Sequence, residues 1–313
     1  MHVETLIQIS MLNSITKEQI ARLRILYDAK SKKKSNIIKE ITIAEIPEAV
    51  YNSNAIENSS LTLSDTEKII LDNIAPQKID IREMFEVNNL VKITELLLDN
   101  QSKNIAVGQI LDLHKILLSN INDDWAGRFR KDNEWVRIGN HIGANPEFVN
   151  DLMHDLVNKY NFDNEMYFID RIAWFHAEFE NIHPFCDGNG RIGRVLINLQ
   201  LIHENLPPII IQNKSKQSEY YPIFRTYSTN GRYDKLSELL ALLLSESLHK
   251  RLTYLCCPKI VSLADWTKQN NVKNNIATNK AKRQTIPAFR LRGKWSIAEN
   301  YRENDKELSI FHT

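Results

Sequence analysis

The fourteen residues from Asn181 to Arg194, NIHPFCDGNGRIGR, hold three of the nine glycines in this chain of 313 residues. The same stretch also contains a histidine, an aspartate and two arginines. Gly188, Asn189 and Gly190 stand where the next helix is predicted to begin. Their backbone N–H groups therefore predict an anion-binding loop at a helix N-terminus, for which phosphate is the natural ligand.

The charged residues beside these glycines extend the prediction. Arg191 and Arg194 lie three positions apart on the predicted helix, and their guanidinium groups suit further phosphate oxygens. Asp187 offers a carboxylate to a hard cation such as Mg²⁺. His183 precedes the loop, and histidine is the side chain most often used as a general base. Together these groups indicate phosphoryl or nucleotidyl transfer.

Other interpretations of the stretch fit less well. The spacing Gly188-x-Gly190-x-x-Gly193 matches the dinucleotide-binding fingerprint, but that motif follows a strand, and here a helix is predicted before it. A calcium loop would need glycine and glutamate where Ile192 and Asn198 stand. A plain Asp-Gly turn explains neither the histidine nor the arginines.

Composition narrows the class of protein. Hydrophobic residues make up 42% and charged residues 25%, as in ordinary globular proteins. No segment approaches the ~18–20 apolar residues of a membrane span, and residues 1–10 lack signal-peptide features. We therefore expect a cytoplasmic protein with no membrane partner. The three cysteines predict neither a disulfide framework nor a zinc site, although Cys186 lies close enough to His183 in sequence to leave a Cys–His nucleophile as an alternative.

Apolar periodicity predicts that the first 250 residues are mostly helical. The expected helices cover 16–29, 37–57, 80–99, 106–120, 147–160, 165–181, 190–205, 215–228 and 233–252, with a further short one after the caps at Thr62, Ser64 and Asp65. Residues 127–149 mix aromatic and β-branched residues with Gly and Asn, which favours a short hairpin. The predicted divisions are an N-terminal helical region at 1–100, a catalytic core at 101–257 and a small module at 258–313.

The small module is strongly basic. From Pro258 to Ile297 nine basic residues face Asp265 alone, so the rest of the chain carries a net charge of −7. Residues 262–297 predict a helix, a turn, a helix and a two-stranded wing, and they resemble the winged helix-turn-helix of excisionase- and MerR-type proteins. The resemblance implies DNA binding. The turn glycine is replaced by Asn270-Asn271 and a later glycine by Gln284-Thr285, so a docking module with a solvated basic face stays open as the alternative.

The central stretch resembles the signature of Fic-domain proteins, H-x-F-x-[DE]-G-N-G-R-x-x-R, at every specified position from His183 to Arg194. The resemblance covers about residues 40–245. It implies an all-α fold, a Fic-type helical bundle with a small β-hairpin flap, to which the winged helix-turn-helix-like domain would be appended. It also implies transfer of AMP from ATP to a Ser, Thr or Tyr hydroxyl of a protein.

By this resemblance His183 deprotonates the target hydroxyl, and Asp187 binds the Mg²⁺ ion that bridges the α- and β-phosphates of ATP. Arg194 would hold the γ-phosphate. The other implied phosphate ligands are Gly188, Asn189, Gly190 and Arg191. Tyr220 and Tyr221 match positions near the family's adenine pocket, where Ser228 replaces a residue that can be Asn in relatives. The implied target-binding flap is Val136, Arg137, Ile138 and Gly139.

A second short motif precedes the signature. SNAIEN, from Ser53 to Asn58, fits the family's inhibitory pattern [ST]-x-x-x-E-[GN]. The resemblance implies that Glu57 reaches Arg194 and occupies the place of the γ-phosphate. The alternative is an ordinary exposed glutamate on a helix.

The resulting hypothesis is an autoinhibited protein adenylyltransferase whose partners are ATP and a protein bearing a hydroxyl. Relatives that phosphorylate their targets depart from the glycine found here as Gly188, so AMP transfer is favoured. The alternatives are a nucleotide-sensing transcriptional regulator and an enzyme that removes AMP from a modified target. DNA binding through residues 262–297 and a homodimer are left open.

Overall fold

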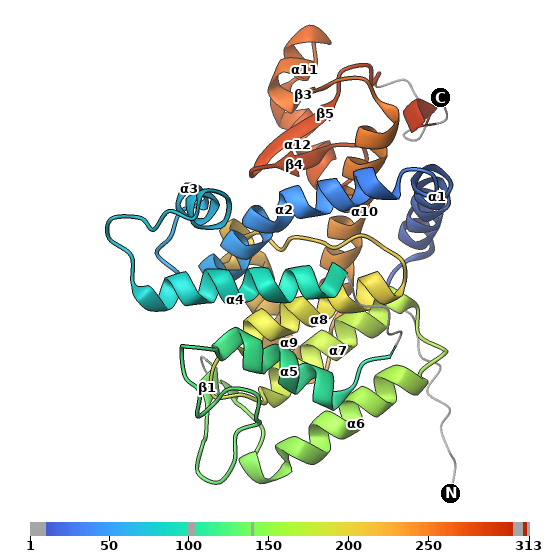
Figure 1. Ribbon diagram of the computed structural model, residues 1–313. Helices are drawn as coiled ribbons and strands as arrows, with labels where there is room; N and C mark the ends of the chain where they lie inside the picture. Colours follow the sequence, from blue (N-terminus) through green and yellow to red (C-terminus); the bar gives the residue numbers. More distant parts are fainter. Residues whose placement is uncertain (1–10, 99–103, 139–140, 303–308, 312–313) are drawn as a thin grey trace, which may run out of the picture.

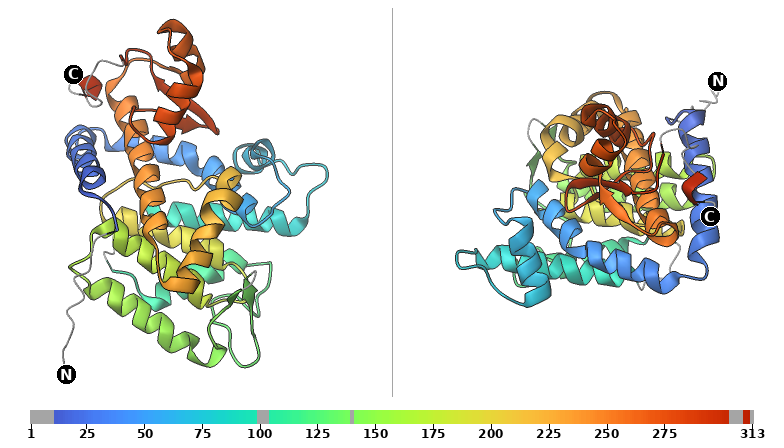
Figure 2. Two further views of the ribbon diagram at one scale, coloured as in Figure 1. Left: turned by 180° about the vertical axis from the view of Figure 1, so that it is seen from behind. Right: turned by 90° about the horizontal axis from the view of Figure 1, so that it is seen from above.

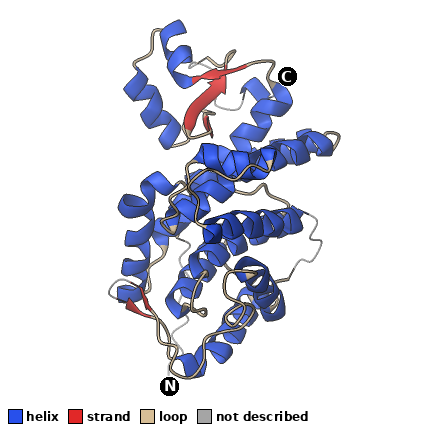
Figure 3. Cartoon of the chain, turned by 60° about the vertical axis from the view of Figure 1, so that its left-hand side comes forward, coloured by secondary structure: helices blue, strands red, loops and turns tan. Residues whose placement is uncertain are grey.

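The computed structural model describes residues 11–98, 104–138, 141–302 and 309–311. The helices in this part of the chain are α1 (Ser14–Ser31), α2 (Ser35–Ile56), α3 (Leu63–Glu67), α4 (Ile81–Leu98), α5 (Val107–Leu118), α6 (Val149–Phe162), α7 (Phe168–Ile182), α8 (Asn189–His203), α9 (Tyr221–Asn230), α10 (Asp234–Cys256), α11 (Leu263–Gln269) and α12 (Asn274–Lys282). The strands are β1 (Arg137–Ile138), β2 (His141–Ile142), β3 (Ile260–Ser262), β4 (Phe289–Leu291) and β5 (Lys294–Ala298). The predicted all-α fold with a small hairpin is confirmed (Figure 3).

The centre of the helical body is the antiparallel pair α7 and α8, which the signature loop connects (Figure 1). Both helices bury side chains on two sides. One side packs with α1 and α10, and the other with α4, α5 and α6. Each large apolar side chain that is fully buried contributes about 1.5–3 kcal/mol, so this double packing fixes the ends of α7 and α8. Those ends carry the signature residues.

A capping box starts the helix that was predicted after Thr62. The hydroxyl of Thr62 accepts from the backbone N–H of Asp65, and the carboxylate of Asp65 accepts from the N–H of Thr62. These hydrogen bonds lower the pKa of Asp65 below its ordinary value. The helix passes into a π-helical turn, Lys68–Asp72, which ends at the left-handed residue Asn73.

The C-terminal module has the predicted order of helix, turn, helix and two strands, and β3 completes an antiparallel sheet of order β3-β5-β4. Asn271 and Gln284, which stand where glycines were expected, both adopt left-handed backbone (φ 53° and 54°). Asparagine tolerates this region better than most residues, which explains the turn. The side chain of Gln284 is buried and donates to the carbonyls of Ala281 and Ala288, which offsets its strain.

The module does not have a core of its own. The sequence predicts a miniature core of Leu263, Trp266, Val272 and Ala277; Leu263, Trp266 and Ala277 are buried, whereas Val272 is half-buried. They belong, however, to the same apolar cluster as α1 and α10. Figure 2 shows α10 running from the helical body into the module. The module is therefore packed onto the body through a continuous core.

The β4–β5 turn binds the helix that carries the predicted inhibitory motif. The backbone N–H groups of Arg292 and Gly293 each donate to the carboxylate of Glu48 on α2, both at 3.0 Å. Glu48 is buried, and α2 lies next to the module (Figure 1). A hydrogen-bonded buried carboxylate is costly to disturb, so this contact holds α2 against the wing.

Two arginines of the wing are used within the chain. Arg290 forms a bidentate pair with Glu246 of α10, and Arg292 pairs with Glu67 of α3. The sequence had suggested that these arginines contact phosphate. In the structure they contact carboxylates of the helical body, so the wing offers less free positive charge than its composition indicates.

Among the described residues, each helix is too short or too polar to cross a lipid bilayer.

Candidate active site

A cavity of about 820 Å³ lies beside the signature loop. Its size falls in the range of small-molecule sites. Walls come from the end of α2, from α7 and α8, and from α9 with Tyr220 just before it. Six of the predicted site residues line it: Glu57, His183, Gly190, Arg194, Tyr220 and Tyr221.

His183 directly follows α7 and ends it in left-handed backbone, with φ 53°. Its N–H donates to the carbonyl of Phe179 at 2.9 Å, which closes the last turn of the helix. A histidine is uncommon in this conformation, and the strain turns its side chain into the cavity. Nδ1 of His183 lies 3.6 Å from Oε2 of Glu180, a residue that sequence analysis did not select.

The loop after His183 needs a glycine and an asparagine for its shape. Gly188 has φ 81°, and a Cβ atom there would lie 2.8 Å from the side chain of Leu117. The side-chain amide of Asn189 accepts from the N–H of Phe185 and donates to its carbonyl, each at 2.8 Å. The Asn189 side chain is thus occupied in closing the loop, so only its backbone N–H is available to a phosphate.

The first turn of α8 carries the N–H groups that were predicted to bind an anion. The N–H groups of Asn189, Gly190 and Arg191 begin the helix and have no acceptor within it. The carboxylate of Glu57 reaches this turn, because a Cβ atom added to Gly190 would lie only 2.2 Å from Oε1 of Glu57. An acidic group therefore already stands where the helix dipole favours negative charge.

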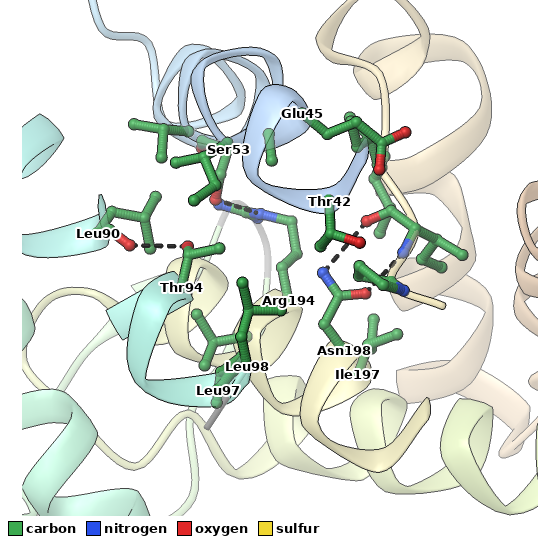
Figure 4. A pocket seen from close by; sticks show the side chains of 18 of the residues that line it. Thr42, Glu45, Ser53, Leu90, Thr94, Leu97, Leu98, Arg194, Ile197 and Asn198 are labelled. Carbon is green, nitrogen blue, oxygen red and sulfur yellow. Dashed lines mark hydrogen bonds between the residues drawn. The ribbon is translucent and has the colours of Figure 1, made fainter. Parts of the chain in front are cut away.

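Arg194 brings the predicted inhibitory residues together. Nη2 of its buried guanidinium donates to Oε1 of Glu57 at 2.8 Å and to the carbonyl of Ser53 at 2.9 Å. Nε donates to the hydroxyl of Ser53 at 3.0 Å, and Figure 4 shows this contact between α8 and α2. Burial lowers the pKa of Arg194, but the Glu57 carboxylate raises it above its ordinary value.

Arg191 and Asp187 lie in a network that sequence analysis did not foresee. Arg191 contacts Oδ1 of Asp187 at 3.2 Å and Oε1 of Glu86 at 2.9 Å. Arg82, also on α4, pairs with the other oxygen of Asp187. Burial raises the pKa of Asp187, but Arg191 and Arg82 lower it below its ordinary value. Asp187 is therefore a charged oxygen ligand that already has cationic partners.

The residues present fit a magnesium ion that is held mainly by nucleotide phosphates. Mg²⁺ commonly binds through one or two carboxylates together with substrate phosphates and water. Asp187 supplies one such carboxylate. Within the described ranges no cluster of three or more His, Cys, Asp or Glu side chains forms a metal site without the nucleotide.

The two tyrosines predicted near adenine present their rings rather than their hydroxyls. The hydroxyl of Tyr220 lies 2.7 Å from Nε2 of His176, and that of Tyr221 donates to the carbonyl of Ile56 at 2.7 Å. Both rings line the cavity together with Phe224. Ser228 also lines it, but its hydroxyl donates to the carbonyl of Arg225. Stacking on these aromatic rings is therefore the contact that the two tyrosines can offer to a nucleobase.

The predicted flap is a short antiparallel hairpin in which Arg137 pairs with Ile142 and Ile138 with His141. Gly139 lies outside the described residues. Val136 precedes the hairpin, and its carbonyl accepts from the N–H of Gly143 at 3.1 Å.

A buried arginine that sequence analysis missed joins this hairpin to the start of the signature loop. Nε of Arg130 donates to the carbonyl of His183 at 2.7 Å, and Nη2 donates to the carbonyl of Ile182 at 3.0 Å. The same guanidinium donates to the carbonyls of Glu134 and Ala144, which flank the hairpin. Burial lowers the pKa of Arg130. No sequence pattern marks this residue, because its four partners become neighbours only on folding.

His114 of α5 packs against the signature loop, and sequence analysis also missed this residue. Its ring stacks on Phe185 with 3.6 Å between centroids, and Nδ1 accepts from the N–H of Gly127 at 3.1 Å. Nε2 therefore carries the proton and donates to the carbonyl of Asp187 at 3.0 Å. Burial lowers the pKa of His114 to about 4, so the ring is neutral near pH 7.

Cys186 is a poor nucleophile. Burial, with Glu134 nearby, raises the pKa of its thiol to about 11. The reactive form is the thiolate, which is scarce at neutral pH when the pKa is raised. The structure thus disfavours the Cys–His alternative.

Residues 104–201 match the Fic/DOC family. The protein adenylyltransferase fic-1 of Caenorhabditis elegans is 32% identical over 178 residues, which are 55% of this chain and 34% of that relative. The protein adenylyltransferase Fic of Aedes aegypti is 30% identical over 177 residues, 55% of this chain and 35% of that relative. The chain thus spans about a third of the length of these curated relatives.

Solved structures show the same fold. A structure of C. elegans Fic-1 (residues 134–508 in its own numbering) superposes with a TM-score of 0.65 at 26% identity, over 76% of this chain and 71% of that one. A Fic family protein from Desulfovibrio desulfuricans G20 has a TM-score of 0.65 at 20% identity. That likeness covers 94% of this chain and 98% of the other, a share that includes most of residues 258–313. With the signature loop in place between α7 and α8, the chain contains a Fic domain of the Fic/DOC family at residues 104–201.

Proposed function

We propose that this chain is a protein adenylyltransferase, which transfers AMP from ATP to a hydroxyl group of a target protein. The observation that carries the proposal is the cavity where His183, the N-terminal turn of α8 and Arg194 converge. Relatives named protein adenylyltransferase share this part of the chain at 30–32% identity, which supports the same reaction here.

In the proposed mechanism the chain binds ATP, orients its phosphates and deprotonates the target hydroxyl. The N–H groups of Asn189, Gly190 and Arg191 hold phosphate oxygens, and the helix dipole favours their negative charge. Arg194 binds the terminal phosphate through its planar fork. His183 accepts the proton of the target hydroxyl as its oxygen attacks the α-phosphorus and pyrophosphate leaves.

Asp187 is the proposed ligand of Mg²⁺, which when bound would neutralise charge on the α- and β-phosphates. Arg82 pairs with this carboxylate and must move away before an ion binds. The hairpin at Arg137–Ile142 offers strand edges to a target segment. Arg130 would keep that hairpin in register with His183.

The resting enzyme is proposed to be autoinhibited. Glu57 holds Arg194 and faces the N-terminal turn of α8, so it competes with the γ-phosphate for both. Ser53 adds two acceptors to the same guanidinium. ATP could enter, but its phosphates would be displaced from in-line geometry.

The position of the radioactive phosphorus in ATP tests which group is transferred. The Glu57→Gly variant should transfer label from [α-³²P]ATP to itself or to lysate proteins and should not transfer label from [γ-³²P]ATP. The Glu57→Gly/His183→Ala variant is the control and should be silent. Transfer from the γ position would show a kinase instead. Release of AMP from a pre-modified target would support the reverse, de-AMPylating enzyme.

DNA binding by residues 262–297 has support from α12 rather than from the wing. Asn275, Asn279, Lys282 and Arg283 are exposed there, whereas Arg290 and Arg292 face carboxylates of the chain. Fluorescence anisotropy with duplex DNA should show affinity that falls with salt and is lost in Lys282→Glu/Arg283→Glu. Arg232→Glu/Lys235→Glu, at two exposed residues outside the module, serves as the charge-matched control. Equal binding by all three proteins would exclude α12.

A further inference from the structure

Glu180 stands one helical turn before His183 on α7, and both side chains line the same cavity. Their closest polar atoms, Oε2 of Glu180 and Nδ1 of His183, are 3.6 Å apart. This is slightly beyond a hydrogen bond, but catalytic hydrogen bonds often shorten only when substrate is bound. Among the described residues, Nδ1 of His183 and Oε1 of Glu180 have no hydrogen-bond partner.

The packing of α8 leaves room for the Glu180 carboxylate and for little else. A Cβ atom added to Gly193 would lie 2.7 Å from Oε1 of Glu180 and 2.7 Å from Cε1 of His176. Gly193 is one of the unspecified positions of the signature, so the signature itself does not account for a glycine there. The close approach of α7 and α8 at Gly193 keeps the Glu180 carboxylate near the imidazole of His183.

The carboxylate is charged in this setting. Burial by itself raises the pKa of Glu180, but the neighbouring His183 and Arg194 lower it below the ordinary value. Glu57 and Tyr220 also face the cavity, and Arg194 is already paired with Glu57. Burial lowers the pKa of His176 to about 4, so that ring is neutral and carries no charge to match Glu180. Nδ1 of His176 also has no hydrogen-bond partner among the described residues, and Nδ1 of His183 is the one that lies 3.6 Å from Oε2 of Glu180.

We propose that Glu180 is a positioning residue that holds the Nδ1–H of His183 and so leaves Nε2 free as the base. The inference rests on the proposed adenylyl transfer. When the target oxygen bonds to the α-phosphorus, the bond to pyrophosphate breaks and pyrophosphate keeps the electron pair. The hydroxyl proton passes to Nε2. Glu180 then stabilises the positive imidazolium until the proton is released.

The tautomer of His183 tests this without any enzymatic activity. The nitrogen shifts of ¹⁵N-histidine-labelled protein distinguish Nδ1–H from Nε2–H, and the His183 signals are assigned by their loss in His183→Gln. The parent should have Nδ1–H. Glu180→Leu, which lacks an acceptor, should switch the ring to Nε2–H. Glu178→Gln is the matched control on the same helix, because its carboxylate binds Tyr227, and it should match the parent.

Kinetic measurements in the Glu57→Gly background test whether the negative charge of Glu180 contributes to the rate. Glu180→Gln keeps an acceptor oxygen but not the charge, so the Nδ1–H tautomer should persist while kcat for AMP transfer falls by about tenfold to a hundredfold. This is part of the about 10²–10⁴-fold that a general base contributes. KM for ATP should stay within about twofold, since Glu180 is not expected to bind the nucleotide.

The outcomes distinguish a failure of the positioning role from a failure of the proposed function. If Glu180→Leu leaves the tautomer of His183 unchanged, or Glu180→Gln transfers AMP at the parent rate, the positioning role is wrong. If Glu57→Gly itself transfers no AMP, the proposed function fails, while the tautomer experiment still decides the contact. Should Glu180→Leu not fold, Glu180→Gln and Glu180→Asp carry the kinetic test.

Discussion

Oε1 of Glu57 lies 2.8 Å from Nη2 of Arg194, across 137 residues of sequence. Glu57 follows the last residue of α2, and Arg194 lies in the second turn of α8. The pair therefore ties the end of an N-terminal helix to the last residue of the Fic signature. A carboxylate in this place resembles a phosphate in charge and hydrogen bonding, which is the physical basis of the proposed autoinhibition.

Glu57→Gly should increase self-AMPylation. The substitution removes the carboxylate that competes for Arg194, and one charge-assisted hydrogen bond of about 1.5 kcal/mol corresponds to roughly a tenfold change in rate. Intact-mass spectrometry after incubation with ATP and Mg²⁺ measures the adduct. Ser53→Ala is expected to have a smaller effect in the same direction. No increase in Glu57→Gly would return Glu57 to the status of an ordinary surface residue.

His183→Ala, made in the Glu57→Gly background, should lower AMP transfer by about 10²–10⁴-fold. The side chain lines the cavity and is not packed in the core, so the melting temperature should change little. ATP binding, measured by calorimetry, should persist because the proposed phosphate ligands lie on α8. Transfer at the Glu57→Gly rate would remove His183 from the mechanism.

Arg130→Lys should uncouple the flap from the catalytic loop. An ammonium group cannot reach the four carbonyls that the guanidinium fork binds. Transfer to a protein target should fall by about tenfold or more, while ATP affinity stays near the parent value. Steady-state kinetics with each substrate varied separately gives both numbers. An equal loss of ATP affinity would point to general misfolding instead.

Glu48→Gln should loosen α2 and raise self-modification. The new amide can accept one backbone hydrogen bond but places a donor against the other N–H, which costs about 2 kcal/mol of unfolding free energy. Glu67→Gln is the matched control, since its partner Arg292 is largely exposed and the pair is worth at most about 1 kcal/mol. Urea unfolding and mass spectrometry report the two effects. Identical behaviour of the two variants would argue against a wing-to-α2 clamp.

The fold should lose stability in mild acid. Burial lowers the pKa of His114 and His249 to about 4 from an ordinary value of 6.5. As the pH falls through this interval the unfolded chain binds protons that the folded chain does not, so the free energy of unfolding decreases. Each group contributes a slope of up to about 1.4 kcal/mol per pH unit.

Urea titrations at pH 7, 6 and 5 measure this slope. His249→Gln should flatten it, because the variant lacks one of the buried imidazoles. A slope that is the same in His249→Gln and in the parent would show that His249 does not contribute.

Local patterns in the sequence predicted much of the helical body. The apolar face of α7 was predicted from its period, and Ile169, Phe175 and Phe179 are buried as expected. The region around Thr62 was recognised from its capping residues. Such features depend on neighbours within one or two turns of helix, and those neighbours can be identified in the sequence.

Contacts between distant segments were not predictable in this way. Arg130 meets His183 across 53 residues, and the wing meets Glu48 across 244. A polar side chain that will be buried against remote carbonyls has the same sequence context as one that will stay in solvent. DNA was therefore predicted as the partner of the basic wing, because the carboxylates that its arginines contact lie on other helices.

The sequence by itself determined that a Fic signature connects two helices, because His183 and Asn189, which shape that loop, bond to residues four positions away. Only the tertiary structure decided which of those groups are free. Asn189 and Tyr221 use their polar side-chain groups in hydrogen bonds to backbone carbonyls, Asp187 is paired with Arg82, and Arg194 is held by Glu57. Charge and hydrogen-bonding capacity belong to a residue, but whether they are available depends on what the fold places beside it.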